Sequence, residues 1–369
     1  MKGRDRNALC WCGSGKKFKK CHSDRENQAL ENPWAAMEVN KQAFTKKKCW
    51  ACDVGLGPCD GDVIKSHTVS RGANLTKIAK DGHVLQYTAS IPEMKKNGGK
   101  LLIKKIGIGV ASVFNGFCAK HDREIFSCIE NQQFTGLPIQ CLVVAYRTMS
   151  RELYGKDASA HLRETLREAD RGLKPFEQVV LQRMLDEVDK GNEAARRELK
   201  MTHNRLTNAL VGKQLDVIRS LVIEFSTPLP FMCAGAWSPF TDLNGNKLQI
   251  GYTDELLEQV FISSFAGDPC AMICISWRDI EGAPGKVIAE QMKALPLNQQ
   301  ATACLQLVMK HVENIFFNPD WFKNLNDERR ERLNQLAADG VDMMGSVPSV
   351  PIRFDVDFPL PIALRSFQV

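Results

Sequence analysis

The sequence lacks any apolar run long enough to cross a membrane. Its longest apolar segments, CLVVAY and AMICISW, fall far short of the roughly 20 residues that a spanning helix needs. The opening residues, MKGRDRNALCWC, contain no apolar stretch resembling a signal peptide. The chain also lacks a glycine-rich phosphate loop, a recognisable Ser/His/Asp set and an internal repeat. We therefore expect a cytoplasmic protein with no membrane partner and without these common catalytic motifs.

Cysteine is abundant and unevenly distributed. Disulfides are rare in a reducing cytosol, so the 13 cysteines need another explanation. Five of them lie in apolar surroundings and are typical of buried small residues. The other eight crowd the first third of the chain, near histidines: Cys10, Cys12, Cys21, Cys49, Cys52, Cys59, Cys118 and Cys128. Such clusters indicate metal sites.

The first cluster lies in LCWCGSGKKFKKCH. Three thiols and one imidazole are enough for a closed tetrahedral zinc site, with the ligands Cys10, Cys12, Cys21 and His22. Gly13 and Gly15 permit the tight turn that a one-residue cysteine spacing requires. So short a stretch has no apolar core of its own, so zinc binding would be what folds it.

This stretch resembles the SEC-C zinc motif, which is known from the C-terminal tail of the bacterial preprotein translocase ATPase. All four ligand positions and the GSGKKFKKC filler match. The resemblance implies a docking module for a chaperone or the ribosome rather than a catalyst. A purely structural zinc knuckle over residues 1–30 is the alternative.

Positive charge is concentrated at the N-terminus. Residues 1–48 contain twelve Lys or Arg and five Asp or Glu, whereas the whole chain has a net charge of +6. This segment therefore indicates an acidic partner, such as nucleic acid or the ribosome, although a solvated basic tail is the alternative. Residues 31–48 are expected to form a basic helical linker that begins near Pro33.

A second cluster follows at once. It begins with a CxxC pair and continues far downstream with a CxxH pair at the start of an amphipathic helix, which is the layout of a treble clef. Five residues compete for the four places around a second zinc ion: Cys49, Cys52, Cys59, Cys118 and His121. Either Cys52 or Cys59 is the spare one.

The second cluster, with SH at residues 66–67 and NGFCAKHD at 115–122, resembles HNH-type nucleases. The resemblance implies that His67 is the general base, that Asn115 steadies the loop and that Asp122 binds a catalytic divalent metal. The sequence departs from that pattern, because Ser66 replaces the usual acid or histidine and the insert before Asn115 is long. A packed structural role for His67 is the alternative reading.

The remainder of the chain predicts helices followed by strands. Residues 159–213 predict an antiparallel helical hairpin, in which Pro175 opens one helix and Gly191 marks a break. We expect this hairpin to serve in homo-oligomerisation or as a spacer. DVIRSLVIEF, PFMCAGAW and AMICISW predict strands. The expected fold class is α+β: a zinc knuckle (1–30), the linker (31–48), a treble-clef, HNH-like domain (49–150), and a mainly helical C-terminal domain with a small sheet (151–369).

The zinc cluster together with YRTMSRELYG and ENIFFNPDW also resembles an uncharacterised bacterial family, of the kind found near phage-defence genes. The sequence as a whole thus favours a zinc protein that binds nucleic acid or a ribosome or chaperone partner. The alternative is a metal-dependent nuclease that uses His67.

Overall fold

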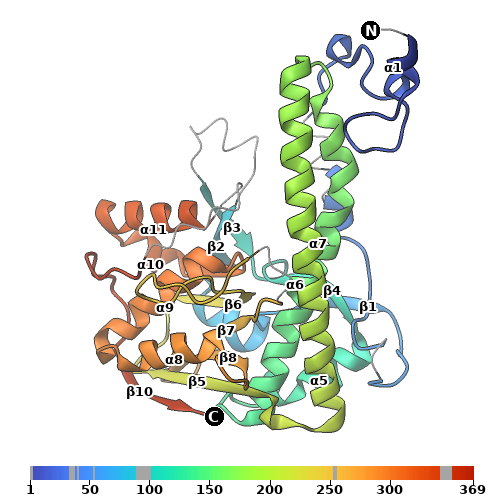
Figure 1. Cartoon of the computed structure of the whole chain (residues 1–369). Coiled ribbons are helices and arrows are strands. Elements are labelled where there is room, and N and C mark those ends of the chain that lie inside the picture. The colour runs from blue at the N-terminus through green and yellow to red at the C-terminus, as the bar shows by residue number, and fades with distance from the viewer. Residues whose placement is uncertain are drawn as a thin grey trace. The chain divides into compact units, whose positions relative to one another are not determined.

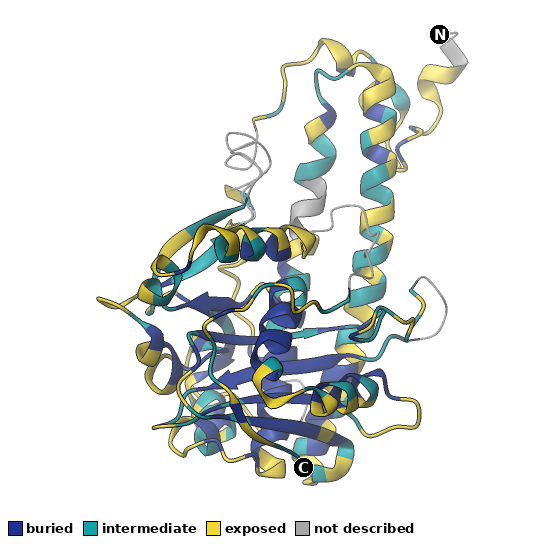
Figure 2. Ribbon diagram, turned by 90° about the vertical axis from the view of Figure 1, so that its left-hand side faces the viewer, coloured by how far each residue is buried: buried dark blue, intermediate teal, exposed yellow. Residues whose placement is uncertain are grey.

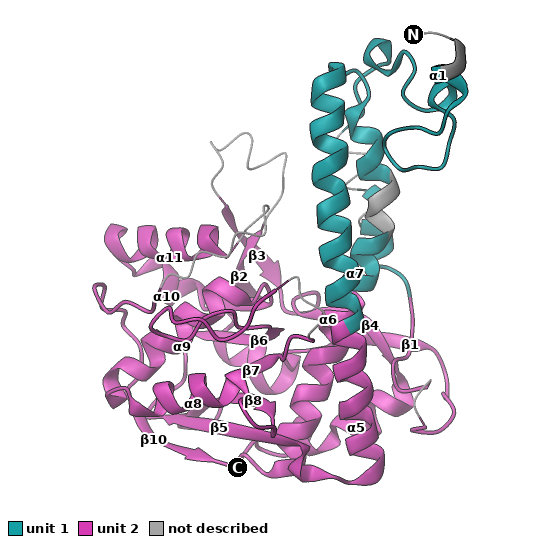
Figure 3. Ribbon diagram, in the orientation of Figure 1, with its two compact units in different colours: residues 1–46, 155–197 teal, residues 47–154, 198–369 magenta. Residues whose placement is uncertain are grey.

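The computed structural model describes residues 3–32, 38–39, 41–52, 55–88, 101–251, 256–340 and 351–369. The chain forms two compact units, shown in Figure 3: residues 1–46 with 155–197, and residues 47–154 with 198–369. This division cuts across the four consecutive segments expected from the sequence, because the two long helices each contribute residues to both units. The expected linker helix over 31–48 falls partly on residues outside those described.

The first unit contains residues 155–197 of the predicted helical hairpin, and the two helices continue into the second unit. Its two helices are α6, Pro138–Arg167, and α7, Pro175–Gly212, joined through the short helix η5, Glu168–Asp170. Within this unit Arg196 on α7 forms an ion pair with Asp157 on α6, and the two helices run side by side in Figures 1 and 2. The unit also holds α1 (Gly3–Asn7), η1 (Phe18–Lys20) and η2 (Arg25–Asn27).

The predicted start of the second helix at Pro175 is confirmed. Proline lacks a backbone N–H group, and at the first position of a helix this group has no partner within the helix, so no hydrogen bond is lost. The predicted break at Gly191 is wrong, because α7 continues through this residue. One glycine costs about 1 kcal/mol in a helix interior. A helix of 38 residues that packs along α6 remains stable despite this loss.

The second unit is built on an eight-stranded antiparallel sheet with the order β10-β5-β8-β7-β6-β9-β2-β3. Its strands are β2 (His83–Thr88), β3 (Leu102–Gly107), β5 (Ile218–Phe225), β6 (Phe231–Trp237), β7 (Val260–Phe265), β8 (Ala271–Arg278), β9 (Ile315–Phe317) and β10 (Ala363–Gln368). The three predicted strands are β5, β6 and β8. The sheet is larger than expected, because it also recruits β2 and β3 from the region assigned to the treble clef.

Both faces of the central strands are covered, which explains their continuous apolar character (Figure 2). On β5, Leu221 and Ile223 belong to one apolar cluster, and Val222 between them belongs to another. The first cluster includes residues of α8 (Pro284–Ala294), α9 (Leu297–His311) and α11 (Asp327–Asp339); the second includes residues of α6 and of α5 (Ala119–Glu130). The sheet therefore lies between two layers of helices.

A second, two-stranded sheet carries Cys118, one of the second set of metal-ligand candidates. It pairs β1, Val63–His67, with β4, Val113–Cys118, and α5 follows β4 directly. Short helices complete the unit: η4 (Arg71–Leu75), α3 (Thr76–Ile78), η6 (Leu215–Val217) and α10 (Pro319–Lys323). The mixed α+β fold class is thus confirmed. Within the described residues no helix is both long and apolar enough to cross a membrane.

Candidate metal centres and neighbouring sites

The first four candidate ligands converge in the first unit. The ligand atoms of Cys10, Cys12, Cys21 and His22 all lie within 4.8 Å of one another. The backbone forms this cluster locally, because the N–H of Cys10 donates to the carbonyl of Lys16 and the N–H of Gly13 to that of Cys10. Gly13 and Gly15 have φ angles of +73° and +69°, a region that residues with a Cβ rarely adopt. The turn that follows Cys12 therefore depends on glycine.

The sulfur–sulfur distance in this cluster suits a tetrahedral ion, and the two sulfur–nitrogen distances are a few tenths of an ångström shorter than such an ion would set. Zinc–sulfur bonds of about 2.3 Å and zinc–nitrogen bonds of about 2.0 Å place neighbouring ligand atoms about 3.5–3.8 Å apart. His22 Nδ1 lies 3.1 Å from Cys10 Sγ and 3.2 Å from Cys21 Sγ, and Cys12 Sγ lies 3.6 Å from Cys21 Sγ. Burial raises the pKa of the Cys10 thiol to about 12, so a bound cation is what would hold this sulfur as a thiolate.

The second cluster joins three separate parts of the second unit. The ligand atoms of Cys49, Cys59, Cys118 and His121 lie within 4.8 Å of one another. Cys118 ends β4 and His121 lies in the first turn of α5, so one backbone corner presents two ligands. His121 Nδ1 lies 3.3 Å from both Cys49 Sγ and Cys118 Sγ, and 3.8 Å from Cys59 Sγ. The other ring nitrogen donates to the carbonyl of Leu56 at 3.1 Å, which fixes the ring with Nδ1 toward the thiols.

Of the two cysteines between which the sequence left a choice, Cys59 is in the group of four and Cys52 lies outside it. Both are exposed, so the separation between them comes from their position and not from burial. Cys49 and Cys52 share the CxxC spacing of a knuckle, but only Cys49 is buried and belongs to the group of four. Its Sγ accepts a hydrogen bond from the N–H of Cys118 at 3.4 Å. Both groups of four could hold a metal ion, and each offers the Cys3His donor set typical of structural zinc.

Comparison with known proteins identifies the first cluster. The SEC-C motif family matches residues 6–24. The N-terminus carries a SEC-C motif. No curated protein and no solved structure matches the chain. The match covers only the knuckle, so the second cluster and the eight-stranded sheet have to be interpreted from their own geometry.

The residues that resemble an HNH site lie near the second cluster. His67 ends β1, is half-buried, and has Nε2 3.4 Å from the carbonyl oxygen of Ile108. Burial lowers the pKa of this imidazole, so His67 is neutral at pH 7. Burial raises the pKa of the Asp122 carboxyl, and this effect is opposed by the Ser66 hydroxyl and by the positive charge of Arg147.

A catalytic metal does not fit these residues. Neither His67 nor Asp122 belongs to a group of three or more His, Cys, Asp or Glu ligands in the described part of the chain. The nearby carboxylate of Glu130 already pairs with Arg147 and accepts a hydrogen bond from Ser70 at 2.7 Å. Asn115 lies in β4, and its carbonyl accepts the N–H of Lys48 at 3.2 Å. In the part of the chain that the structure describes, His67 and Asp122 therefore lie near a group of residues that could hold a metal ion, and they do not form a second such group themselves.

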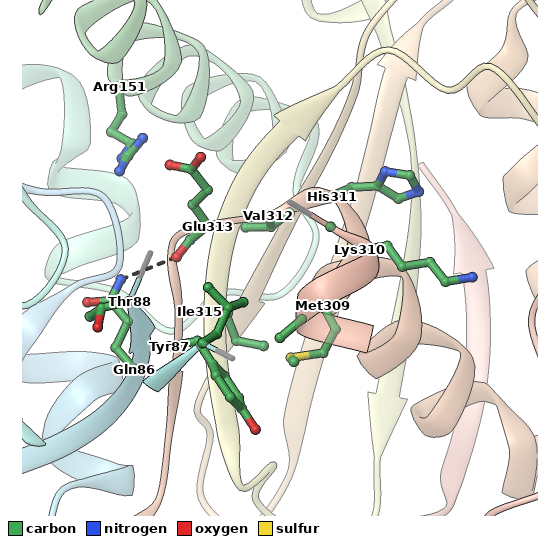
Figure 4. Close-up of a pocket in the computed structure, with 13 residues that line it drawn as sticks. Gln86, Tyr87, Thr88, Arg151, Met309, Lys310, His311, Val312, Glu313 and Ile315 are labelled. Atoms are coloured by element: carbon green, nitrogen blue, oxygen red, sulfur yellow. Dashed lines mark hydrogen bonds between the residues drawn. The ribbon is translucent and has the colours of Figure 1, made fainter. Parts of the chain in front are cut away.

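The second unit also holds a cavity that no sequence motif indicated. Its volume is about 590 Å³, within the range of small-molecule sites. Figure 4 shows the side chains of Arg151 and Glu313 extending toward one another from opposite walls, while the amide of Gln86 donates to the carbonyl of Glu313 at 3.2 Å. His311 stacks on Trp237 at 5.3 Å, and burial lowers its pKa to about 4. The cavity is therefore lined by the cationic residues Arg151 and Lys310, by the carboxylate residue Glu313, and by apolar residues.

Proposed function

We propose that this protein is a zinc-organised binding protein that docks onto nucleic acid through its SEC-C motif, with both Cys3His groups holding structural zinc. The observation that carries the proposal is the outer surface of the motif. Four lysines there are exposed, and within the described residues none of them has a carboxylate partner: Lys16, Lys17, Lys19 and Lys20. Unpaired lysines on a compact, metal-held loop suit a row of phosphates.

Two apolar side chains stand beside these lysines. Leu9 is 73% exposed and Trp11 is 44% exposed, although large apolar residues are normally buried. The Trp11 ring packs against the imidazole of His22 with ring centroids 4.4 Å apart, so one of its surfaces is held while part of it remains in water. An exposed aromatic ring among lysines supports stacking with an unpaired base as well as contact with phosphates.

A salt titration tests the proposal. Each phosphate neutralised on a duplex contributes about −0.9 to the slope of log affinity against log salt. Four contacts would reduce affinity roughly a hundredfold between 50 and 200 mM salt. We expect single-stranded RNA or DNA and duplex DNA to bind the full chain with such a slope. A variant with Lys16, Lys17, Lys19 and Lys20 changed to Gln should lose most of it.

A matched control removes the same charge from the second unit. Lys65, Lys77, Lys105 and Lys213 are also exposed, and changing all four to Gln should leave the slope within experimental error of the original protein. If the full chain binds none of the nucleic acids, or if both quadruple variants bind alike, the proposal fails. A ribosome or chaperone partner then remains the reading implied by the SEC-C motif. A role in phage defence stays a prediction from resemblance alone.

The alternative is a nuclease centred on His67. It is favoured by one observation, the neutral imidazole at the end of β1 beside the carboxyl of Asp122. We expect no cleavage of nucleic acid by the full chain with Mg²⁺, Mn²⁺ or Ni²⁺, because the described residues supply no metal cage there. Metal-dependent cleavage that disappears in His67→Ala would make the alternative the better reading.

A further inference from the structure

A carboxylate from the helical hairpin completes the surroundings of the SEC-C motif. Asp170 ends η5, and its side chain is 0% exposed. Its Oδ2 accepts hydrogen bonds from His22 Nε2 at 2.8 Å and from Gln182 Nε2 at 2.7 Å. Its Oδ1 accepts one from Arg25 Nε. Three donors thus surround one buried carboxylate, and all of these residues belong to the first unit.

The guanidinium of Arg25 supplies a positive charge next to the buried carboxyl of Asp170, since it lies in contact with both Asp170 and Glu168. Such a paired charge compensates for removing a carboxylate from water.

The hydrogen bond with Asp170 fixes which ring nitrogen of His22 faces the three cysteine sulfurs. If Nε2 carries the proton that Asp170 accepts, the lone pair lies on Nδ1, which points at Cys10 Sγ and Cys21 Sγ. Metal-binding histidines commonly donate their second nitrogen to a carboxylate in this way, and the carboxylate makes the ring a better ligand. At the other metal centre, a neutral carbonyl, that of Leu56, fills this position.

Further contacts tie the same loop to the end of the hairpin. The guanidinium of Arg25 donates to the carbonyl of Arg167 at 3.0 Å, and the N–H of Gly172 donates to the carbonyl of Arg25 at 3.0 Å. Arg167 in turn donates to the carbonyl of Cys12 at 3.4 Å. The hairpin end thus holds the backbone on both sides of the metal group.

We propose that Asp170 is a positioning residue for the metal site of the SEC-C motif. Metal binding at the motif then stabilises the end of the hairpin, residues 165–185, and an ordered hairpin end in turn strengthens metal binding. Asp170 lies far outside residues 6–24, which match the motif family. A free-standing zinc knuckle would need no such residue. The coupling makes the end of the hairpin responsive to whether the motif is loaded with metal.

The first test measures metal affinity in the full chain by competition with a chelator. Asp170→Asn keeps the side-chain shape but removes the charge, and we expect it to weaken zinc binding at the SEC-C motif roughly 10–100-fold. Glu168→Gln is the matched control: it removes a charge at the same place and also contacts Arg25, but does not touch His22. It should change the affinity less than about threefold.

The second zinc ion serves as an internal reference, because its ligands lie in the other unit. The competition step that disappears in Cys10→Ser/Cys12→Ser identifies the motif site. Hydrogen exchange then reports the coupling without any use of nucleic acid. In that double variant the amides of residues 165–185 should exchange faster than in the unaltered chain. Wild-type affinity in Asp170→Asn, or unchanged exchange in this segment, would overturn the proposal.

Discussion

Acid should destabilise the second unit through one buried histidine. His203 on α7 is 2% exposed. Its ring centroid lies 5.0 Å from that of Tyr146 and 5.7 Å from that of Trp50. Trp50 follows the candidate ligand Cys49 in the sequence. His203 Nε2 and the Ser150 hydroxyl are 3.1 Å apart. Burial, together with the positive charge of Lys48, lowers the pKa of His203 to about 4. The folded protein therefore keeps this ring neutral where an unfolded chain would protonate it.

The size of the effect follows from proton linkage. An unfolded histidine titrates near 6.5, so between pH 6.5 and 4 the unfolded state binds more protons than the folded state. The free energy of unfolding therefore falls as the pH falls through this window. With 1.36 kcal/mol for each pKa unit, His203 alone should remove about 1.4 kcal/mol at pH 5.5 and about 3 kcal/mol by pH 4. Above pH 7 it should contribute no pH dependence.

The assay compares the chain with His203→Gln by urea unfolding at pH 7.5 and pH 5.5. Glutamine keeps an N–H group that can donate to Ser150, but it takes up no proton. The substitution therefore changes the free energy of unfolding only through packing, by an amount that does not depend on pH. Both proteins carry the same metal groups, and acid release of metal therefore cancels in the comparison. We expect the original chain to lose about 1.4 kcal/mol more than the variant on acidification. Equal losses would show that His203 does not titrate as its burial implies.

Two further predictions concern the second unit. Cys59→Ser should lower the metal content of the purified chain from about two ions to about one, whereas Cys52→Ser should leave it at about two. The reason is that only Cys59 lies with Cys49, Cys118 and His121. Elemental analysis that showed the reverse would contradict this ligand set. Gly285→Ala should cost about 1–3 kcal/mol in chemical unfolding, since the new methyl group would lie 2.3 Å from Cβ of Trp277. Gly72→Ala, with nothing within 4 Å, is the control, and equal stability of the two variants would argue against close packing there.

The sequence alone determined the features that depend on near neighbours along the chain. The SEC-C ligands lie within 13 residues, and Gly13 and Gly15 allow the positive φ angles of the turn between them, so the cluster could be recognised without a fold. The start of α7 at Pro175 and the strands β5, β6 and β8 follow from local preferences and apolar runs. These features would be expected in almost any surrounding structure.

Tertiary structure decided everything that depends on distant segments meeting. The CxxC spacing favoured Cys52 equally with Cys59, and only the path of the chain around His121 separates them. The contact of His22 with Asp170 joins residues 148 positions apart, and the pairing of β2 with β9 places the insert after His67 in the C-terminal sheet. No local propensity encodes such contacts, because they are selected by the joint burial of apolar faces and the pairing of buried polar groups.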